Sequence, residues 1–160
     1  YSKSMECSVL DSQGKKIYPI MGCYGIGITR LLPSIIEESH DERGPILPLP
    51  VAPFEVHICV INKKETLVHE ESEKLYKEFQ KQGIDILFDD RDEKAGSQFA
   101  DADLMGIPFR VIISPKTLAE DSVEFKYRDN RSESAKIKVK DIVNFVKKEL
   151  EIEYAKFNID

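Results

Sequence analysis

Residues 54–88 read FEVHICVINKKETLVHEESEKLYKEFQKQGIDILF, and this stretch decides the fold. It opens and closes on apolar runs of strand length, FEVHICVI and IDILF. Between them, residues 64–82 show the spacing of an amphipathic helix, and Gly83 stands where helices commonly end. Two strands joined by a helix predict parallel pairing with a right-handed crossover. The inward stripe of this helix is expected to be Val68, Ser72, Leu75 and Phe79.

The alternation of strand and helix continues toward the C-terminus. We expect a short helix over residues 97–104, a strand over 109–113, a hairpin from 123–127 and 135–139, and a final helix over 142–151. The hairpin would add antiparallel strands to a parallel sheet. The sequence therefore predicts an α/β fold with a mixed, mainly parallel five-stranded sheet and three helices.

Upstream of residue 54 the pattern changes twice. Residues 4–28 favour an antiparallel pair of strands, the second rich in glycine. Aliphatic residues at helical spacing favour a helix over residues 30–39. Four prolines between residues 45 and 53 predict a stiff, extended connector. We therefore expect four parts: residues 1–45 of one domain, a linker at 46–53, a second domain at 54–152 and a tail at 153–160.

The composition limits the possible functions. Among 160 residues, Lys and Arg number 23 and Asp and Glu number 29, which gives a formal net charge of −6. That balance argues against a protein that coats DNA or RNA with a uniform basic surface. The basic excess is local, because residues 108–140 hold eight Lys or Arg against five Asp or Glu.

Cysteine, histidine and hydropathy patterns add further expectations. No apolar run approaches the length of a bilayer span, so no membrane partner is expected. The three cysteines share no C-x-x-C spacing and the three histidines lie far apart, which predicts a reduced, cytoplasmic protein without a metal site. Because the chain begins with Tyr1, we take it to be a piece of a longer chain.

Residues 21–30, MGCYGIGITR, carry the most informative motif of the N-terminal part. A dinucleotide-binding G-x-G-x-x-G would need a third glycine at the position of Arg30, so that interpretation fails. Gly25 and Gly27 remove side chains, so a flat base could lie against the backbone. Arg30 offers a permanent cation with forked donors, which suits a polyphosphate.

This string resembles motif 3 of the class II aminoacyl-tRNA synthetases, and in its full length that of prolyl-tRNA synthetases of the bacterial type. The resemblance covers nearly the whole chain. It continues through Asp41-Glu42-Arg43-Gly44, Pro50-Val51-Ala52-Pro53-Phe54, Gln82-Gly83-Ile84, Asp89-Asp90-Arg91, Glu93, Gly96, Phe99-Ala100-Asp101, Gly106-Ile107-Pro108 and Lys126-Tyr127-Arg128.

The resemblance implies an enzyme that attaches proline to its tRNA through a prolyl-adenylate, using ATP and Mg²⁺, and that forms a homodimer. It gives Arg30 the role of binding ATP phosphate, and it places Gly25, Gly27 and Cys23 at the ATP and amino-acid site. Cys23 could equally be a small buried filler. Motifs 1 and 2 of the class are missing before Tyr1, so this chain alone is expected to be inactive and to hold no cofactor.

Residues 53–152 resemble the α/β anticodon-binding domain of class IIa synthetases, which implies the anticodon of proline tRNA as partner. In open α/β sheets, ligands gather at the carboxyl ends of the parallel strands. A loop of mixed charge at 89–94 suits a splayed guanine, because arginine can bond O6 and N7 and a carboxylate can accept from N1–H and N2–H₂. The candidate anticodon-binding residues are Asn62, Arg91, Glu93, Lys94, Phe99 and Lys116.

Other interpretations remain open at this stage. Asp89, Asp90 and Arg91 could form an internal ion-pair network, with Phe99 in the core. The basic residues Arg110, Lys116, Lys126, Arg128 and Arg131 could contact phosphates or could form a solvated strand face. The chain could also come from a class II synthetase for threonine, glycine or histidine, or be a non-catalytic α/β module that binds a protein.

Overall fold

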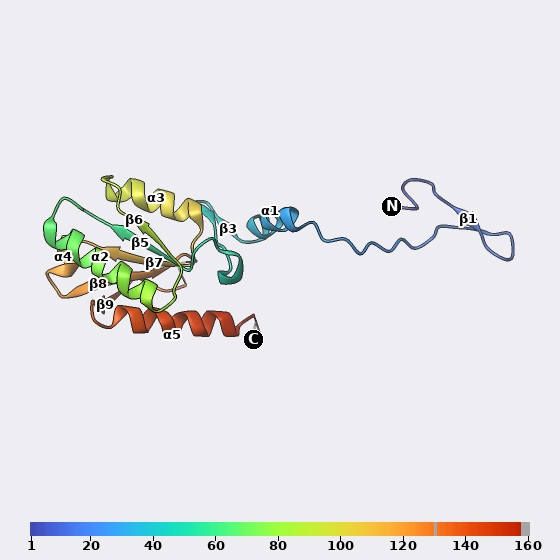
Figure 1. Ribbon diagram of the computed structural model, residues 1–160. Helices are drawn as coiled ribbons and strands as arrows, with labels where there is room; N and C mark the ends of the chain where they lie inside the picture. The colour runs from blue at the N-terminus through green and yellow to red at the C-terminus, as the bar shows by residue number, and fades with distance from the viewer. Residues whose placement is uncertain (130, 158–160) are drawn as a thin grey trace. The chain divides into compact units, whose positions relative to one another are not determined.

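The computed structural model describes residues 1–129 and 131–157 (Figure 1). The chain divides into two compact units, residues 1–31 and residues 32–160. The expected domain limits at 45 and 53 stay a prediction. Among the described residues, no helix is both long and apolar enough to cross a membrane.

The first unit contains one small antiparallel pair, β1 (Val9–Leu10) and β2 (Lys16–Ile17). Its turn closes on Asp11, whose Oδ1 accepts hydrogen bonds from the backbone N–H groups of Gln13 and Lys15. Gly14 follows in the left-handed region, with a φ of 76°. These contacts close a short turn at residues 11–14 between the two strands.

The expected glycine-rich strand over residues 22–28 is wrong. Among the described residues, no strand is formed from 18 to 27, and Ile20 and Tyr24 are fully exposed. A strand needs a neighbouring strand for its hydrogen bonds, and Pro19 and the glycines contribute little to such pairing. Helix α1 (Ile28–Glu38) begins two residues earlier than predicted, with the Gly27 carbonyl accepting from the N–H groups of Arg30 and Leu31.

The second unit is built on a five-stranded mixed sheet in the order β6-β5-β7-β8-β9. The central strand β5 pairs in parallel with β6 and β7, while β8 and β9 add antiparallel pairs. This confirms the predicted fold class. The strands are β5 (Val56–Val60), β6 (Ile86–Asp89), β7 (Phe109–Ile113), β8 (Ser122–Tyr127) and β9 (Ala135–Lys138).

The helices cover the two faces of the sheet (Figure 1). Helices α2 (Thr66–Lys81) and α5 (Ile142–Ala155) pack on the face that carries the main core, and the stripe of α2 predicted from the sequence is buried there. Helix α3 (Ala95–Met105) packs on the opposite face, against Cys59 and Ile112. Because strand side chains alternate, β5 and β7 contribute residues to both layers.

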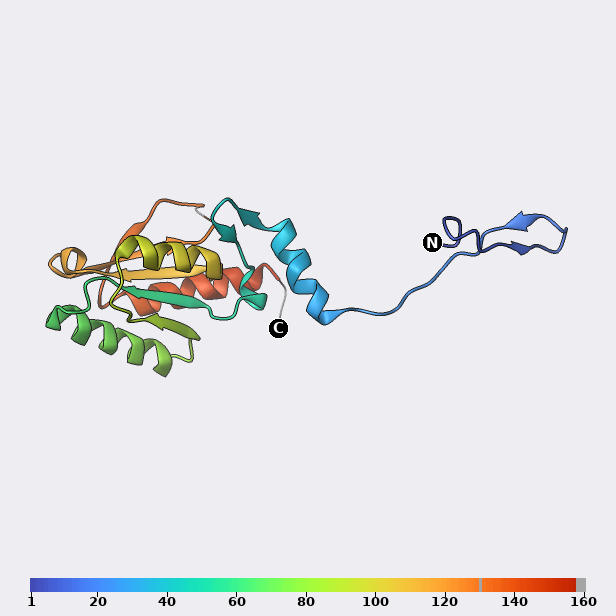
Figure 2. The same ribbon diagram turned by 90° about the horizontal axis from the view of Figure 1, so that it is seen from above.

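The proline-rich stretch is not the stiff, extended connector that its composition predicted. Together with the residues before it, it forms a hairpin, β3 (His40–Asp41) and β4 (Gly44–Pro45), and a 3-10 helix, η1 (Leu49–Val51). Leu47 and Leu49 are buried, and Leu49 joins the main core. The prolines stiffen the backbone, but the leucines between them fix it to the domain. Figure 2 shows the hairpin beside the C-terminal end of α3.

Helix boundaries also differ from the sequence prediction. Helix α3 begins at Ala95, two residues before the predicted start. Helix α5 continues to Ala155, and Glu153 in its last turn is buried beside Arg131. The expected tail at 153–160 is therefore partly helical, and its residues 158–160 lie outside the described part of the chain. Helix α4 (Pro115–Leu118) was not predicted, although Ser114 caps it reciprocally with Thr117.

Candidate nucleic-acid interface

Two loops meet at the carboxyl ends of the parallel strands and form a surface hollow of about 510 Å³. One loop follows β5 and the other follows β6, as the strand order predicts for ligand sites of open α/β sheets. The structure brings three predicted anticodon-binding residues together here: Asn62, Glu93 and Lys94. We call it the carboxyl-end hollow; its lining is Ile61, Asn62, Lys64, Asp92, Glu93, Lys94, Ala95 and Pro115.

Asn62 turns the chain abruptly at the end of the central strand. Its φ is 65°, in the left-handed region that asparagine tolerates better than most residues. Its carbonyl accepts a hydrogen bond of 3.0 Å from the N–H of Glu65. The exposed Asn62 side chain is thereby held at the rim where β5 ends.

Ion pairs tie the two loops together. Lys63 donates to Asp90 at 2.5 Å, and Lys64 lies 2.8 Å from Asp92. The hydrogen bond to Asp92 raises the pKa of the Lys64 amine. Glu93 and Lys94 remain exposed beside these pairs. The hollow therefore offers a carboxylate, an amide and an ammonium group, so it can both accept and donate hydrogen bonds.

Arg91 lies outside the lining of this hollow, in an ion-pair network. Its Nε and Nη2 donate to the two oxygens of Asp89 at 2.9 and 2.8 Å, and Nη2 lies 2.8 Å from Asp101. These contacts raise the pKa of Arg91 and lower that of the buried Asp89. Asp89 and Arg91 therefore form an ion pair, as one of the open interpretations held, while Asp90 pairs with Lys63 instead. The Arg91 contacts hold the loop after β6 to α3.

Gln98 is a structural residue that the sequence analysis missed. It is fully buried on α3, and its Nε2 donates to the carbonyls of Val60 at 3.2 Å and Arg91 at 2.9 Å. One side chain thus links the end of β5 to the loop after β6. Its position one helical turn before the buried Ala102 was the available signal, because both share one helix face.

Phe99 and Lys116 lie apart from the carboxyl-end hollow. Phe99 is half-buried against Cys59, Ala102 and Ile112, and the Arg110 guanidinium lies 5.9 Å from its ring centroid. Lys116 is exposed on α4. The stacking of a base on Phe99 and the contact of Lys116 with RNA stay predictions.

A second and larger concavity of about 830 Å³ lies between α3 and the β8–β9 hairpin. We call it the sheet-face groove. Within it Arg110 is buried and donates to Asp103 at 2.5 Å, so the expectation that it contacts phosphate is wrong. The lining residues are Arg43, Phe99, Asp103, Arg110, Ile112, Glu124, Lys126, Arg131, Ser132, Glu133 and Ser134.

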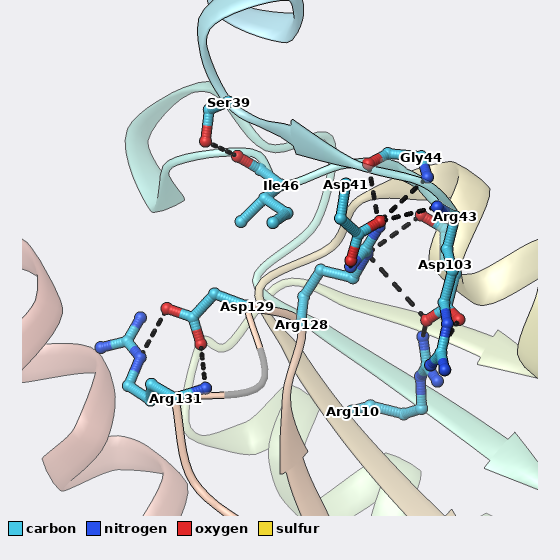
Figure 3. A network of polar contacts seen from close by, with 10 residues as sticks. All are labelled: Ser39, Asp41, Arg43, Gly44, Ile46, Asp103, Arg110, Arg128, Asp129 and Arg131. Atoms are coloured by element: carbon cyan, nitrogen blue, oxygen red, sulfur yellow. Dashed lines mark hydrogen bonds and ion pairs between the residues drawn. The ribbon is translucent and has the colours of Figure 1, made fainter.

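Arg128 is also internal, although the sequence placed it among the phosphate contacts. Only 1% of its side chain is exposed, and it binds Asp41, the Gly44 carbonyl and the Asp103 carbonyl (Figure 3). Arg131 is more exposed but pairs with Asp129 and Glu153. Lys126 also lines the groove and is half-buried, and no ion pair joins it to another of the described residues.

The register of the sheet adds two lysines that the sequence analysis did not select. Lys136 lies opposite Glu124 and Lys138 opposite Ser122, so both share the sheet face of Lys126. Lys136 and Lys138 are exposed, and Lys136 lies 2.5 Å from Glu120. The alternation K-I-K-V-K at 136–140 was the signal, because a period of two places every second residue on one face.

The motif 3 residues lie in the other unit of the chain. Cys23, Gly25, Gly27 and Arg30 are all exposed, and a Cβ added at Gly25 would meet nothing within 4 Å. The segment therefore gives no enclosed floor for a nucleotide by itself. Among the described residues, no cluster of three or more His, Cys, Asp or Glu could hold a metal ion.

Comparisons with known proteins agree with this geometry. A family model described as "Anticodon binding domain" matches residues 55–149. The proline–tRNA ligase of Endomicrobium trichonymphae is 53% identical over 135 residues, which are 84% of this chain and 24% of that protein. Those of Geotalea daltonii and Syntrophus aciditrophicus are 50% and 43% identical, over 80% and 94% of this chain. The chain spans about a quarter of the length of these relatives.

Proposed function

The chain belongs to the family of anticodon-binding domains, and we propose that it is the part of a proline–tRNA ligase that reads the anticodon of proline tRNA. The similarity to proline–tRNA ligases over most of the chain supports this assignment. It also favours proline over the threonine, glycine and histidine enzymes, and over a module that binds only proteins. The structural observation that carries the proposal is the meeting of Asn62, Glu93 and Lys94 in the carboxyl-end hollow.

The chemistry of the carboxyl-end hollow suits a splayed guanine. The Glu93 carboxylate can accept from N1–H and N2–H₂ on the Watson–Crick edge, and Lys94 can donate to O6 or N7. The Asn62 amide can do either. An adenine or a cytosine in the same position would meet a different pattern of donors and acceptors. Codons for proline require two guanines in the anticodon, which gives these groups a defined target.

The lysines of the open sheet face would contact the RNA backbone. Lys126, Lys136 and Lys138 share one face of β8 and β9, where the chain has its local basic excess. Phosphate contacts position a nucleic acid without reading its sequence. The contribution of these lysines to RNA affinity should therefore fall as the salt concentration rises, and it should not depend on the anticodon sequence.

Binding of a proline tRNA transcript to the whole chain tests this proposal. Fluorescence anisotropy should show weaker binding when both anticodon guanines are replaced by adenine. Glu93→Gln should reduce the preference for the guanine transcript about tenfold, since one well-placed base contact is worth about 1–3 kcal/mol. Glu151→Gln, at an exposed glutamate of α5, is the matched control. Equal affinity for the two transcripts would refute guanine reading.

The activity of the longer enzyme follows from the same assignment. We propose that it attaches proline to tRNA using ATP and Mg²⁺, as a cytoplasmic homodimer, and that Arg30 binds ATP phosphate with Gly25, Gly27 and Cys23 beside it. ATP and Mg²⁺ would act only in the longer protein, because the exposed residues 23–30 form no enclosed site here. This chain alone should therefore not form an adenylate.

A further inference from the structure

A third hollow of about 390 Å³ lies on the other side of Pro115, between the start of α2, α4 and the end of β9. Its floor is apolar: Val68 is fully buried, Leu118 and Val139 are half-buried, and Leu67 stands at the rim with 67% of its surface exposed. We call it the acidic hollow. Its lining is Glu65, Leu67, Val68, Glu71, Pro115, Leu118, Ala119, Asp121 and Val139.

The charge of this rim has one sign. Glu65, Glu71 and Asp121 surround the apolar floor, and among the described residues that line it there is no Lys, Arg or His. Glu71 bonds Lys74 at 2.5 Å, outside the hollow, while Glu65 and Asp121 are exposed. Two backbone contacts fix the position of Asp121: its N–H donates to the Leu118 carbonyl, and its carbonyl accepts from the N–H of Val139.

The two hollows that share Pro115 therefore differ in what they can bind. The carboxyl-end hollow contains Lys64 and Lys94 beside its carboxylates, whereas the acidic hollow has carboxylates alone around an apolar floor. Phosphate groups would be repelled at the acidic rim. A lysine or arginine beside an aliphatic or aromatic side chain would match both its charge and its floor. Its volume lies in the usual range for binding pockets, about 300–1,000 Å³.

We propose that the acidic hollow docks a cationic amphipathic segment of a partner protein. One apolar side chain of that segment enters between Leu67, Leu118 and Val139, and flanking lysines or arginines pair with Glu65 and Asp121. This surface is separate from the carboxyl-end hollow, so a protein could be held beside a bound tRNA. The proposal does not depend on guanine reading.

A synthetic amidated peptide of lysine and leucine is a suitable probe for the whole chain. Methyl NMR spectra should show shifts for Leu67, Leu118 and Val139 on titration, and the affinity should fall as salt rises. Leu67→Lys removes apolar surface and adds a like charge, so it should weaken binding about tenfold or more. Because Leu67 is exposed, this variant should keep the fold.

The matched control is Leu104→Lys, at a leucine of α3 that is 63% exposed and lies outside the acidic hollow. It should leave peptide affinity unchanged. A second control is the same peptide with glutamate in place of lysine, which should not shift the three methyl groups. Equal effects of the two variants, or equal binding of the two peptides, would overturn the proposal. So would shifts of these methyl groups by an RNA stem-loop, because the hollow would then belong to the RNA surface.

Discussion

The guanidinium of Arg128 forms two hydrogen bonds of 2.8 Å with the carboxylate of Asp41 (Figure 3). Arg128 directly follows strand β8, and Asp41 belongs to the hairpin β3–β4. Asp41 also accepts from the backbone N–H groups of Arg43 at 2.9 Å and Gly44 at 3.1 Å. One buried cation thus fixes the hairpin to the sheet and to the Asp103 carbonyl of α3.

Removing one partner of this pair should destabilise the fold strongly. Asp41→Asn removes the carboxylate that binds the buried Arg128 through two hydrogen bonds and leaves only the Asp103 carboxylate, 4.0 Å away, which should cost about 3 kcal/mol. Denaturant unfolding of Asp41→Asn, Arg128→Met and the double variant measures this. We expect the double variant to lose much less than the sum of the two single variants. Simple additivity of the two effects would show that the contact contributes no coupling.

The free energy of unfolding of the domain should decrease as the pH falls, because the buried His57 resists protonation in the folded state. Burial lowers the pKa of His57 from 6.5 to about 4, against the opposing effect of Asp89, and Arg110 and Arg91 lower it further. The histidine is therefore neutral in the native state and gains a proton on unfolding. Its contribution to the unfolding free energy is complete above about pH 6.5 and is lost by pH 4, amounting to about 3 kcal/mol.

A variant at the same position separates this effect from the titration of carboxylates. Among the described residues, neither ring nitrogen of His57 has a hydrogen-bond partner, so His57→Leu should keep the stability at pH 7. It should flatten the dependence of unfolding free energy on pH between 6.5 and 4. NMR titration of the His57 ring gives the pKa directly, and a value near 6.5 would contradict the prediction.

Gly106 and Gly96 should respond oppositely to alanine. Gly106 has a φ of 66°, and a Cβ there would lie 2.8 Å from the Pro45 carbonyl oxygen, so Gly106→Ala should cost about 2 kcal/mol. A Cβ at Gly96 would meet nothing within 4 Å, so Gly96→Ala in α3 should stabilise by about 0.5 kcal/mol. Thermal unfolding of both variants checks the contrast. Similar melting temperatures would rule out the close approach of β4 to α3.

Arg30→Ala should abolish the activation step in the longer enzyme. If Arg30 binds ATP phosphate, ATP–pyrophosphate exchange is lost while binding of proline tRNA is kept, because the proposed anticodon contacts lie in the domain matched at residues 55–149. Arg43→Ala, at an arginine that lines the sheet-face groove, serves as the comparison and should keep exchange. Full exchange by Arg30→Ala would remove the ATP role.

The sequence predicted best what depends on regular spacing. The buried stripe of α2 follows from a period of 3.6 with Gly83 just after the helix. The limits of β7 follow from a short apolar run between Pro108 and Pro115. The glycine-rich strand failed because a strand depends on neighbours that the sequence pattern does not reveal. The prediction of an extended connector was wrong because proline content indicates only a stiff backbone. The burial of Leu47 and Leu49 depends instead on the elements that pack over them.

The candidate site was predictable in position more than in detail. The rule for carboxyl ends of parallel strands predicts Asn62, Glu93 and Lys94 at one edge of the sheet, and they line one hollow there. It could not separate Arg91, whose guanidinium pairs with Asp89 and Asp101, from Glu93 and Lys94, which line the hollow. Charge type alone does not show whether an arginine faces carboxylates or solvent.

The packing of the β3–β4 hairpin determines the shortest fragment of the chain that keeps the contacts of this domain. A fragment that begins at residue 53 would lack Asp41, Leu47 and Leu49. Arg128 would then lack the carboxylate that binds it, and the domain would lack two buried leucine side chains. A piece that starts before Ser39 keeps them, including the hydrogen bonds that Ser39 shares with Ile46. Anyone who grafts this domain onto another protein should therefore carry the preceding hairpin with it.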